Sequence, residues 1–309
     1  MFKLRKFSHV LCAIVIAQLA GCASFEFTKP LPEQKQPVSV SVSKEGLSGW
    51  SDMPLGVYNV PDSQVVISGH QSGQGAALLF GLVGVAVVHA ANASAGAQTV
   101  KDAEQQLKID LTAPVAAAVH DAIAAGRLPA QFTEKPGSPK RLVLAPGLVL
   151  SFVNDKDVRP FVVIRADLLG NDRVPEWKGR FIASSGESRP LLGPGGWLEA
   201  DAKALKESTK RNLDLAMNVM TSDIRNPAKR DETKMYAVES NFPFVKQRFQ
   251  TKGYVLAEDD NYYTYIPKIG DVIVFTGVNV LDKHAVTVRP AKPEDPVIKI
   301  VPLAEPAKN

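Results

Sequence analysis

The stretch from 141 to 183, RLVLAPGLVLSFVNDKDVRPFVVIRADLLGNDRVPEWKGRFIA, decides the fold that we expect. It contains three strand-like runs, over 141–152, 160–169 and 176–183, which are rich in apolar and β-branched residues. The runs are separated by NDKD and GNDR, and Asn, Asp and Gly favour tight turns. The sequence therefore predicts a three-stranded antiparallel meander.

A helix is expected on each side of this meander. Upstream, apolar residues recur every four positions from 107 to 123, and Gly126 follows as a terminator. Pro114 places either the start of this helix or a kink in it. Downstream, apolar residues at helical spacing extend from 197 to 224. This order predicts an α+β fold, in which an antiparallel sheet has its helices packed on one face.

Further strands are expected before the first of these helices and after the second. The alternating run VSVSVS, at 38–43, is typical of a half-buried strand, and a second strand is expected over 57–68. We place the whole α+β domain at 38–226. After the charged linker NPAKRDET, we expect a small C-terminal β-rich module at 234–290 and a Pro-rich, extended or disordered tail at 291–309. In the module we expect a short helix at 244–249 closed by Gly253, and strands at 254–257, 262–266, 271–276 and 285–289.

The N-terminus has the pattern of an export signal. MFKLRK supplies three basic residues, and an apolar run from Val10 to Ala20 follows that is too short for a comfortable membrane span. The run ends in Leu19-Ala20-Gly21-Cys22. These four residues resemble the lipobox of bacterial lipoproteins, in which Leu, a small residue, Gly or Ala, and Cys occur in this order.

The resemblance implies a lipid anchor. Residues 1–21 would be a lipoprotein signal peptide, and Cys22 would carry a diacylglyceryl group and an acylated amine after cleavage. Ala23 is not the Asp that tends to retain such proteins in the inner membrane, so the implied location is the outer membrane, facing the periplasm. Residues 22–37 contain three prolines and are expected to form an extended tether. An ordinary signal peptide with an incidental cysteine is the alternative.

The cysteine content and the net charge of the chain after cleavage argue against several kinds of site. The other cysteine, Cys12, lies in the predicted signal peptide, so no disulfide or cysteine metal ligand is expected after cleavage. The formal net charge of +4 includes the three basic residues of that peptide, so the remaining chain is nearly neutral. Such a balance gives no support for nucleic-acid binding.

The segment 73–97 is unusual because it lies within a longer stretch without Asp, Glu, Lys or Arg. Its small residues recur at spacings of four, as in helices that approach one another closely in membranes. Three structures fit it: a helix in or on the membrane, a helix buried in a protein core or oligomer, and a glycine-rich loop. Self-association through 73–97 follows from the first two.

We find no residue pattern that specifies a reaction. His120 is expected to be an exposed helix residue, GHQSGQG around Ser72 lacks the glycine that a serine nucleophile elbow requires, and the acidic run at 258–260 is expected to be a hairpin turn. We therefore expect no catalytic residues, no cofactor and no metal site. Tyr263 and Tyr265 share one face of an expected strand, and they are the candidate binding surface.

These features favour a non-catalytic, lipid-anchored envelope protein that works in assembly, scaffolding or transport support through an envelope protein partner. A lipoprotein that holds a lipid or peptidoglycan fragment between the α+β domain and the small β-rich module is the alternative, and an envelope hydrolase is a distant one. The order of elements weakly resembles the domains of penicillin-binding-protein activators and of transport-associated auxiliary lipoproteins. Because no motif of either family is present, the resemblance carries no function.

Overall fold

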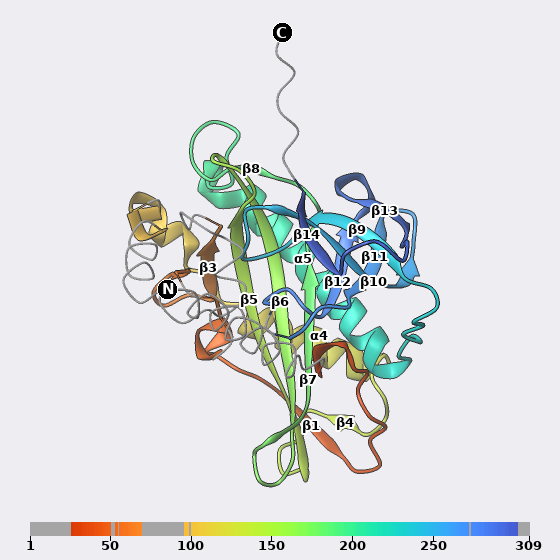
Figure 1. The fold of residues 1–309 in the computed structure, drawn as a ribbon. Helices are drawn as coiled ribbons and strands as arrows, with labels where there is room; N and C mark the ends of the chain where they lie inside the picture. Colours follow the sequence, from red (N-terminus) through yellow and green to blue (C-terminus); the bar gives the residue numbers. More distant parts are fainter. Residues whose placement is uncertain are drawn as a thin grey trace, which may run out of the picture.

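One large sheet dominates the molecule (Figure 1). The computed structural model describes residues 26–50, 53–54, 56–69, 96–98, 100–271 and 273–301. The helical elements are η1 (Glu26–Thr28), η2 (Gly46–Gly49), η3 (Lys101–Leu107), α4 (Thr112–Ala124), α5 (Glu199–Arg225) and η4 (Lys283–Ala285). The described residues form 14 strands, which are β1 (Val38–Val42), β2 (Tyr58–Asn59), β3 (Val65–Ser68), β4 (Phe132–Thr133), β5 (Lys140–Phe152), β6 (Asp157–Leu169), β7 (Pro175–Ala183), β8 (Arg189–Pro190), β9 (Tyr236–Asn241), β10 (Arg248–Glu258), β11 (Tyr262–Pro267), β12 (Val278–Asp282), β13 (Thr287–Pro290) and β14 (Ile298–Val301).

The predicted meander forms the centre of the sheet. β5 and β6 pair antiparallel over almost their whole lengths, and β6 pairs antiparallel with β7 over residues 162–169. The two helices that flank it in sequence are also present as α4 and α5, and α4 begins at Thr112, two residues before Pro114. Proline is well tolerated in the first turn of a helix because its missing N–H has no partner there.

The predicted fold class is wrong, because the sheet is mixed and includes the C-terminal strands. β1 and β3 pair in parallel with the two halves of β5, and β12 pairs in parallel with β7 at Val278↔Phe181. Through β12, the C-terminal strands continue the same sheet instead of forming a small β-rich module. These parallel pairs join segments far apart in sequence, so no local sequence pattern predicts them.

Local predictions failed mainly after residue 235. The expected helix at 244–249 is absent, because Phe249 lies in β10 and Gly253 pairs with Pro267 in mid-strand. The expected strand at 271–276 is a series of turns among its described residues. In contrast, β12 lies in a segment that we expected to be a turn, and β14 lies in the expected tail. β9 lies in a part of the expected module to which we assigned no element.

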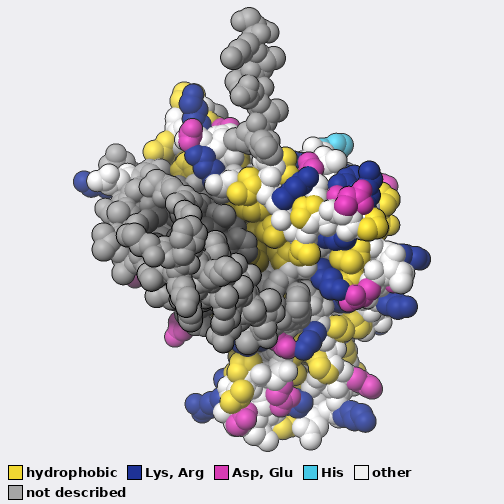
Figure 2. All heavy atoms as spheres, viewed as in Figure 1, with side chains coloured by type: hydrophobic (Ala, Val, Ile, Leu, Met, Phe, Trp, Pro, Cys, Tyr) yellow, Lys and Arg dark blue, Asp and Glu magenta, His cyan; other side chains and the backbone are white. Residues whose placement is uncertain are grey.

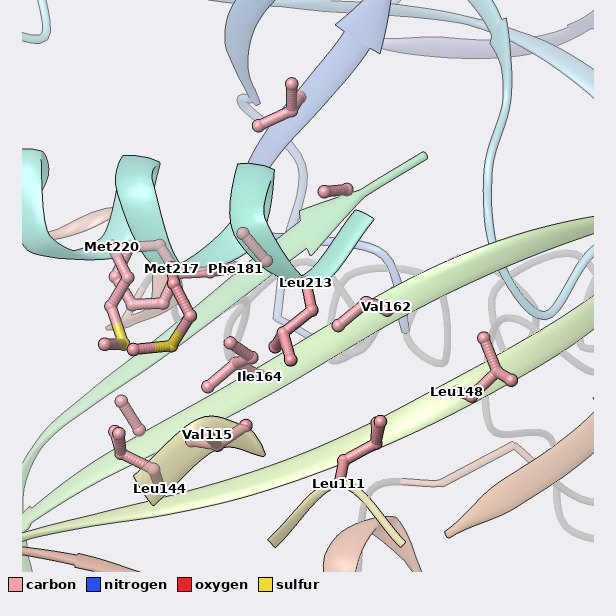
Figure 3. Close-up of a cluster of buried hydrophobic side chains, with 14 of the residues drawn as sticks. Leu111, Val115, Leu144, Leu148, Val162, Ile164, Phe181, Leu213, Met217 and Met220 are labelled. Carbon is pink, nitrogen blue, oxygen red and sulfur yellow. The ribbon is translucent and has the colours of Figure 1, made fainter. Parts of the chain in front are cut away.

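The two faces of the sheet have separate cores. On one face, α4 and α5 bury apolar side chains against the meander, and Leu213, Met217 and Met220 of α5 lie near Ile164 and Phe181 (Figure 3). The opposite face is covered by η2 and by the segments around 242–245 and 269–275. Among the described residues, no helix is long and apolar enough to cross a membrane. Apart from its last residues, the segment 73–97 lies outside the described part of the chain.

Candidate functional site

The first described residues after Cys22 are bound firmly to the body of the protein. The carboxylate of Asp271 accepts hydrogen bonds from the backbone N–H of Glu26, at 2.6 Å, and of Phe27, at 3.3 Å. The Phe27 side chain is buried, with 7% of its surface exposed. We call residues 26–31 the N-terminal junction, and its contacts show that this part of the predicted tether lies against the sheet.

The N-terminal junction follows a free part of the edge of β7. β12 pairs with β7 only at 181–183, so no strand of the described chain pairs with the rest of this edge. η1 contacts β7 there, and the indole N–H of Trp177 donates to the carbonyl of Lys29 at 3.0 Å. Leu31 then enters the helix-covered core. The junction thereby passes from one face of the sheet to the other and covers an edge that is otherwise open to pairing.

Arg180 is the centre of the contacts on the loop-covered face. Its side chain is only 1% exposed, and its guanidinium lies 4.0 Å from the centroid of the Phe27 ring. One Nη donates to the carbonyls of Val274, at 2.7 Å, and Thr276, at 3.1 Å. A single cation on β7 therefore connects the N-terminal junction to the loop before β12.

A second arginine fixes the junction to the end of α5. Arg230 donates two hydrogen bonds of 2.9 Å to the Asp223 carboxylate, and its Nε donates to the carbonyl of Thr28 at 3.3 Å. Both members of this ion pair are largely buried, which strengthens their interaction relative to a surface pair. The turn that follows α5 is thus placed beside η1.

The two tyrosines of the expected binding surface on β11 differ in exposure. Tyr265 has 0% exposure, and its hydroxyl lies 3.0 Å from Thr251 Oγ1. Burial raises the pKa of this hydroxyl far above its ordinary value. Tyr263 is half-buried on the same face, with the ammonium of Lys283 4.9 Å from its ring centroid. Of the predicted pair, only Tyr263 reaches solvent.

Tyr262 faces the opposite side and lines a shallow depression against α5. This depression has a volume of about 470 Å³ and lies between α5 and β11, where a ligand was one of our hypotheses. Burial raises the pKa of Tyr262, and the neighbouring Asp282 carboxylate raises it further. The lining is mostly ionic and does not suit a lipid; it consists of Glu207, Lys210, Arg211, Asp214, Leu215, Asn218 and Tyr262.

The remaining titratable candidates lie apart from one another. His120 is exposed on α4, as predicted, and its Nδ1 lies 2.8 Å from Glu134 Oε2, which raises the pKa of the imidazole. The acidic run forms a hairpin turn in which Asp259 accepts hydrogen bonds from the N–H groups of Asn261 and Tyr262. No group of three metal-ligating side chains occurs in the part of the chain that the structure describes. Ser72 lies outside the described residues.

Sequence reasoning missed the N-terminal junction because its partners are remote. Asp271 lies 245 residues from Glu26 in the chain, and Trp177 lies 148 residues from Lys29. One local signal was available: Phe25 and Phe27 are aromatic residues in a segment otherwise typical of a solvated spacer. Buried aromatic side chains contribute strongly to packing, so their presence in a tether indicates docking.

Comparisons with known proteins give one weak structural likeness. The sequence matches no family model, and no curated protein matches it. Among solved structures, the chain is similar to protein XCC0632 from Xanthomonas campestris, which is described with the family DUF330. The identity is 12% and the TM-score is 0.22, over 63% of this chain and 87% of that one. A likeness of this strength leaves the family of this chain open.

Proposed function

We propose that this protein is a lipid-anchored lipoprotein of the cell envelope, held at the outer membrane on its periplasmic side by Cys22. It works through protein contacts in assembly, scaffolding or transport support, and catalyses no reaction. The observation that carries the proposal is the lipobox sequence at 19–22, which ends four residues before a firmly docked N-terminal junction. A docked segment next to the lipidated residue couples the anchor mechanically to the sheet.

The edge strand β14 supports a role in protein contacts. Among the described strands, β14 pairs with β10 alone. Ile300 is 45% exposed and the preceding Val297 is 52% exposed. Figure 2 shows apolar side chains gathered where β14 crosses the front of the view in Figure 1. An exposed edge with apolar side chains suits the addition of an extended segment from a partner protein.

Substitution of the anchor tests the first half of this proposal. We expect the full chain to label with a radioactive fatty acid and to fractionate with membranes, whereas Cys22→Ala loses the label. Membrane association of the unlabelled variant would point to a second attachment. An unlabelled natural chain would contradict the proposal.

Photocrosslinking in intact cells tests the second half. A photoreactive amino acid at Ile300 should yield a defined protein adduct. The same amino acid at Val174, which is 58% exposed on the turn before β7, is the matched control. Equal adducts from both positions, or none from Ile300, would contradict a partner at β14.

A further inference from the structure

The distance between the lipid and the body of the protein is short. Only four peptide units separate Cys22 from Glu26, and a fully extended chain of that length spans at most about 14 Å. The acyl chains place a lipidated residue at the level of the headgroups. Because Glu26 is bonded to Asp271, the body itself must lie within this reach of the membrane.

We propose that the face carrying η1 and the turn at 225–234 rests on the phospholipid headgroups, with the N-terminal end of α5 directed away from them. This inference rests on the proposed lipidation of Cys22. It adds a specific membrane-facing surface, which neither the lipobox nor the fold indicates alone.

The charge of the turn at 225–234 fits a phospholipid surface. The hydrogen bond from Arg230 to Thr28 places this turn directly beside η1. Arg230 is paired with Asp223, and Glu232 is paired with Lys268. Lys229 and Lys234 are exposed and lie near the Asp231 carboxylate, and the turn has four cationic and two anionic side chains, so its net charge is positive. Exposed cations next to a lipid anchor gain favourable energy from the anionic phosphates of the membrane.

The length of helix α5 makes the orientation testable, because its two ends should lie at different distances from the membrane. Residues 200–202 have positive φ, and the regular part of the helix follows them and ends at Arg225. At about 1.5 Å per residue, Lys203 lies roughly 33 Å from the end of the helix that adjoins η1. Lys203 and Lys229 are both exposed lysines, so they form a matched pair of labelling sites.

The test uses the lipidated protein in vesicles of phosphatidylethanolamine and phosphatidylglycerol. The sequence contains no cysteine after Cys22, so Lys229→Cys and Lys203→Cys each introduce a single free thiol for a fluorophore. A quencher attached to the headgroups should reduce the fluorescence at 229 at least threefold more than at 203. Equal quenching at both sites, or stronger quenching at 203, would overturn the proposed orientation.

Two further measurements separate this inference from the anchor. Flotation with the vesicles is scored first, so that a protein that fails to float contradicts the lipid anchor and not the orientation. A flexible insertion of 20 Gly and Ser residues between Ser24 and Phe25 adds a root-mean-square reach of about 25 Å. In the floated variant, the difference between the two labels should shrink; an unchanged difference would overturn the short tether as the orienting device.

Discussion

One face of the sheet is covered by two regular helices, whereas the other is covered by turns and loops that come from distant parts of the sequence. On the helical face, α4 and α5 are amphipathic, and their apolar residues meet those of β5, β6 and β7 (Figure 3). On the loop-covered face, Leu47, Phe244 and Phe275 come from three separate segments. The first face depends on local periodicity, and the second depends on single long-range contacts.

This difference predicts where single substitutions do most damage. Loss of one apolar side chain from a helix leaves the other turns of that helix in place, with a cavity at one point. Loss of a residue that holds several loops together also leaves a cavity, and in addition it removes the hydrogen bonds that fix those loops. The following substitutions compare the two faces in order of decreasing effect.

Arg180→Ala should have the largest effect. It removes a fully buried side chain and leaves the carbonyls of Val274 and Thr276 without this donor. We expect the free energy of unfolding to fall by about 4 kcal/mol, as for other large buried truncations that also leave acceptors unsatisfied. Urea denaturation measures this loss, and Lys178→Ala on the same strand should change the value by less than about 0.5 kcal/mol. A loss for Arg180→Ala no larger than that of Lys178→Ala would contradict its central role.

Leu213→Ala tests the helix-covered face. Leu213 lies in the core between α5 and the sheet, so its truncation leaves a cavity. We expect a loss of about 3 kcal/mol from transfer and cavity terms together. The readout is again urea denaturation, with Lys210→Ala on the exposed side of α5 as control. If Leu213→Ala exceeded Arg180→Ala, the comparison between the two faces would be reversed.

Gly147→Ala tests how closely η2 approaches the sheet. A Cβ at this position of β5 would overlap the side chain of Leu47, so this side chain or η2 must shift. We expect a loss of about 2 kcal/mol from overpacking. The double substitution Gly147→Ala/Leu47→Ala should cost less than the sum of the two single changes, because the smaller side chain makes room. Strict additivity in thermal denaturation would show that the two residues do not compete for space.

The smallest effect on stability is expected from the hydrogen bond between His120, on the solvent side of α4, and Glu134. The hydrogen bond with Glu134 raises the pKa of His120. Its stabilising contribution is complete below the unfolded-state pKa of about 6.5, and it is lost as the pH rises through the higher folded-state pKa. A ¹H–¹⁵N NMR titration of the imidazole should show the raised pKa, and Glu134→Gln should lower it. An unchanged titration in Glu134→Gln would contradict this interaction.

The same contrast explains what could be predicted from the sequence. The meander and the two helices were identified because turn residues and helical spacing are local signals. β12 was expected to be a turn, since VNVLD becomes a strand only by pairing with β7 and β11. At the candidate site, the alternation that groups Tyr263 with Tyr265 could be read directly, but the burial of Tyr265 depends on loops elsewhere in the chain. Asp271 gave no local sign of its bond to Glu26.

The docking of the N-terminal junction on Asp271 also constrains how the chain folds. It joins residues 245 positions apart, while β14 near the other end must still find β10. Contacts with such large sequence separation are formed slowly, because loop closure must precede them. A polypeptide is made from its N-terminus, so the edge of β7 that this segment covers stays unprotected until nearly the whole chain, including Asp271, is available. The chain must therefore pass through an aggregation-sensitive stage before residues 26–31 can cover the open edge of the sheet.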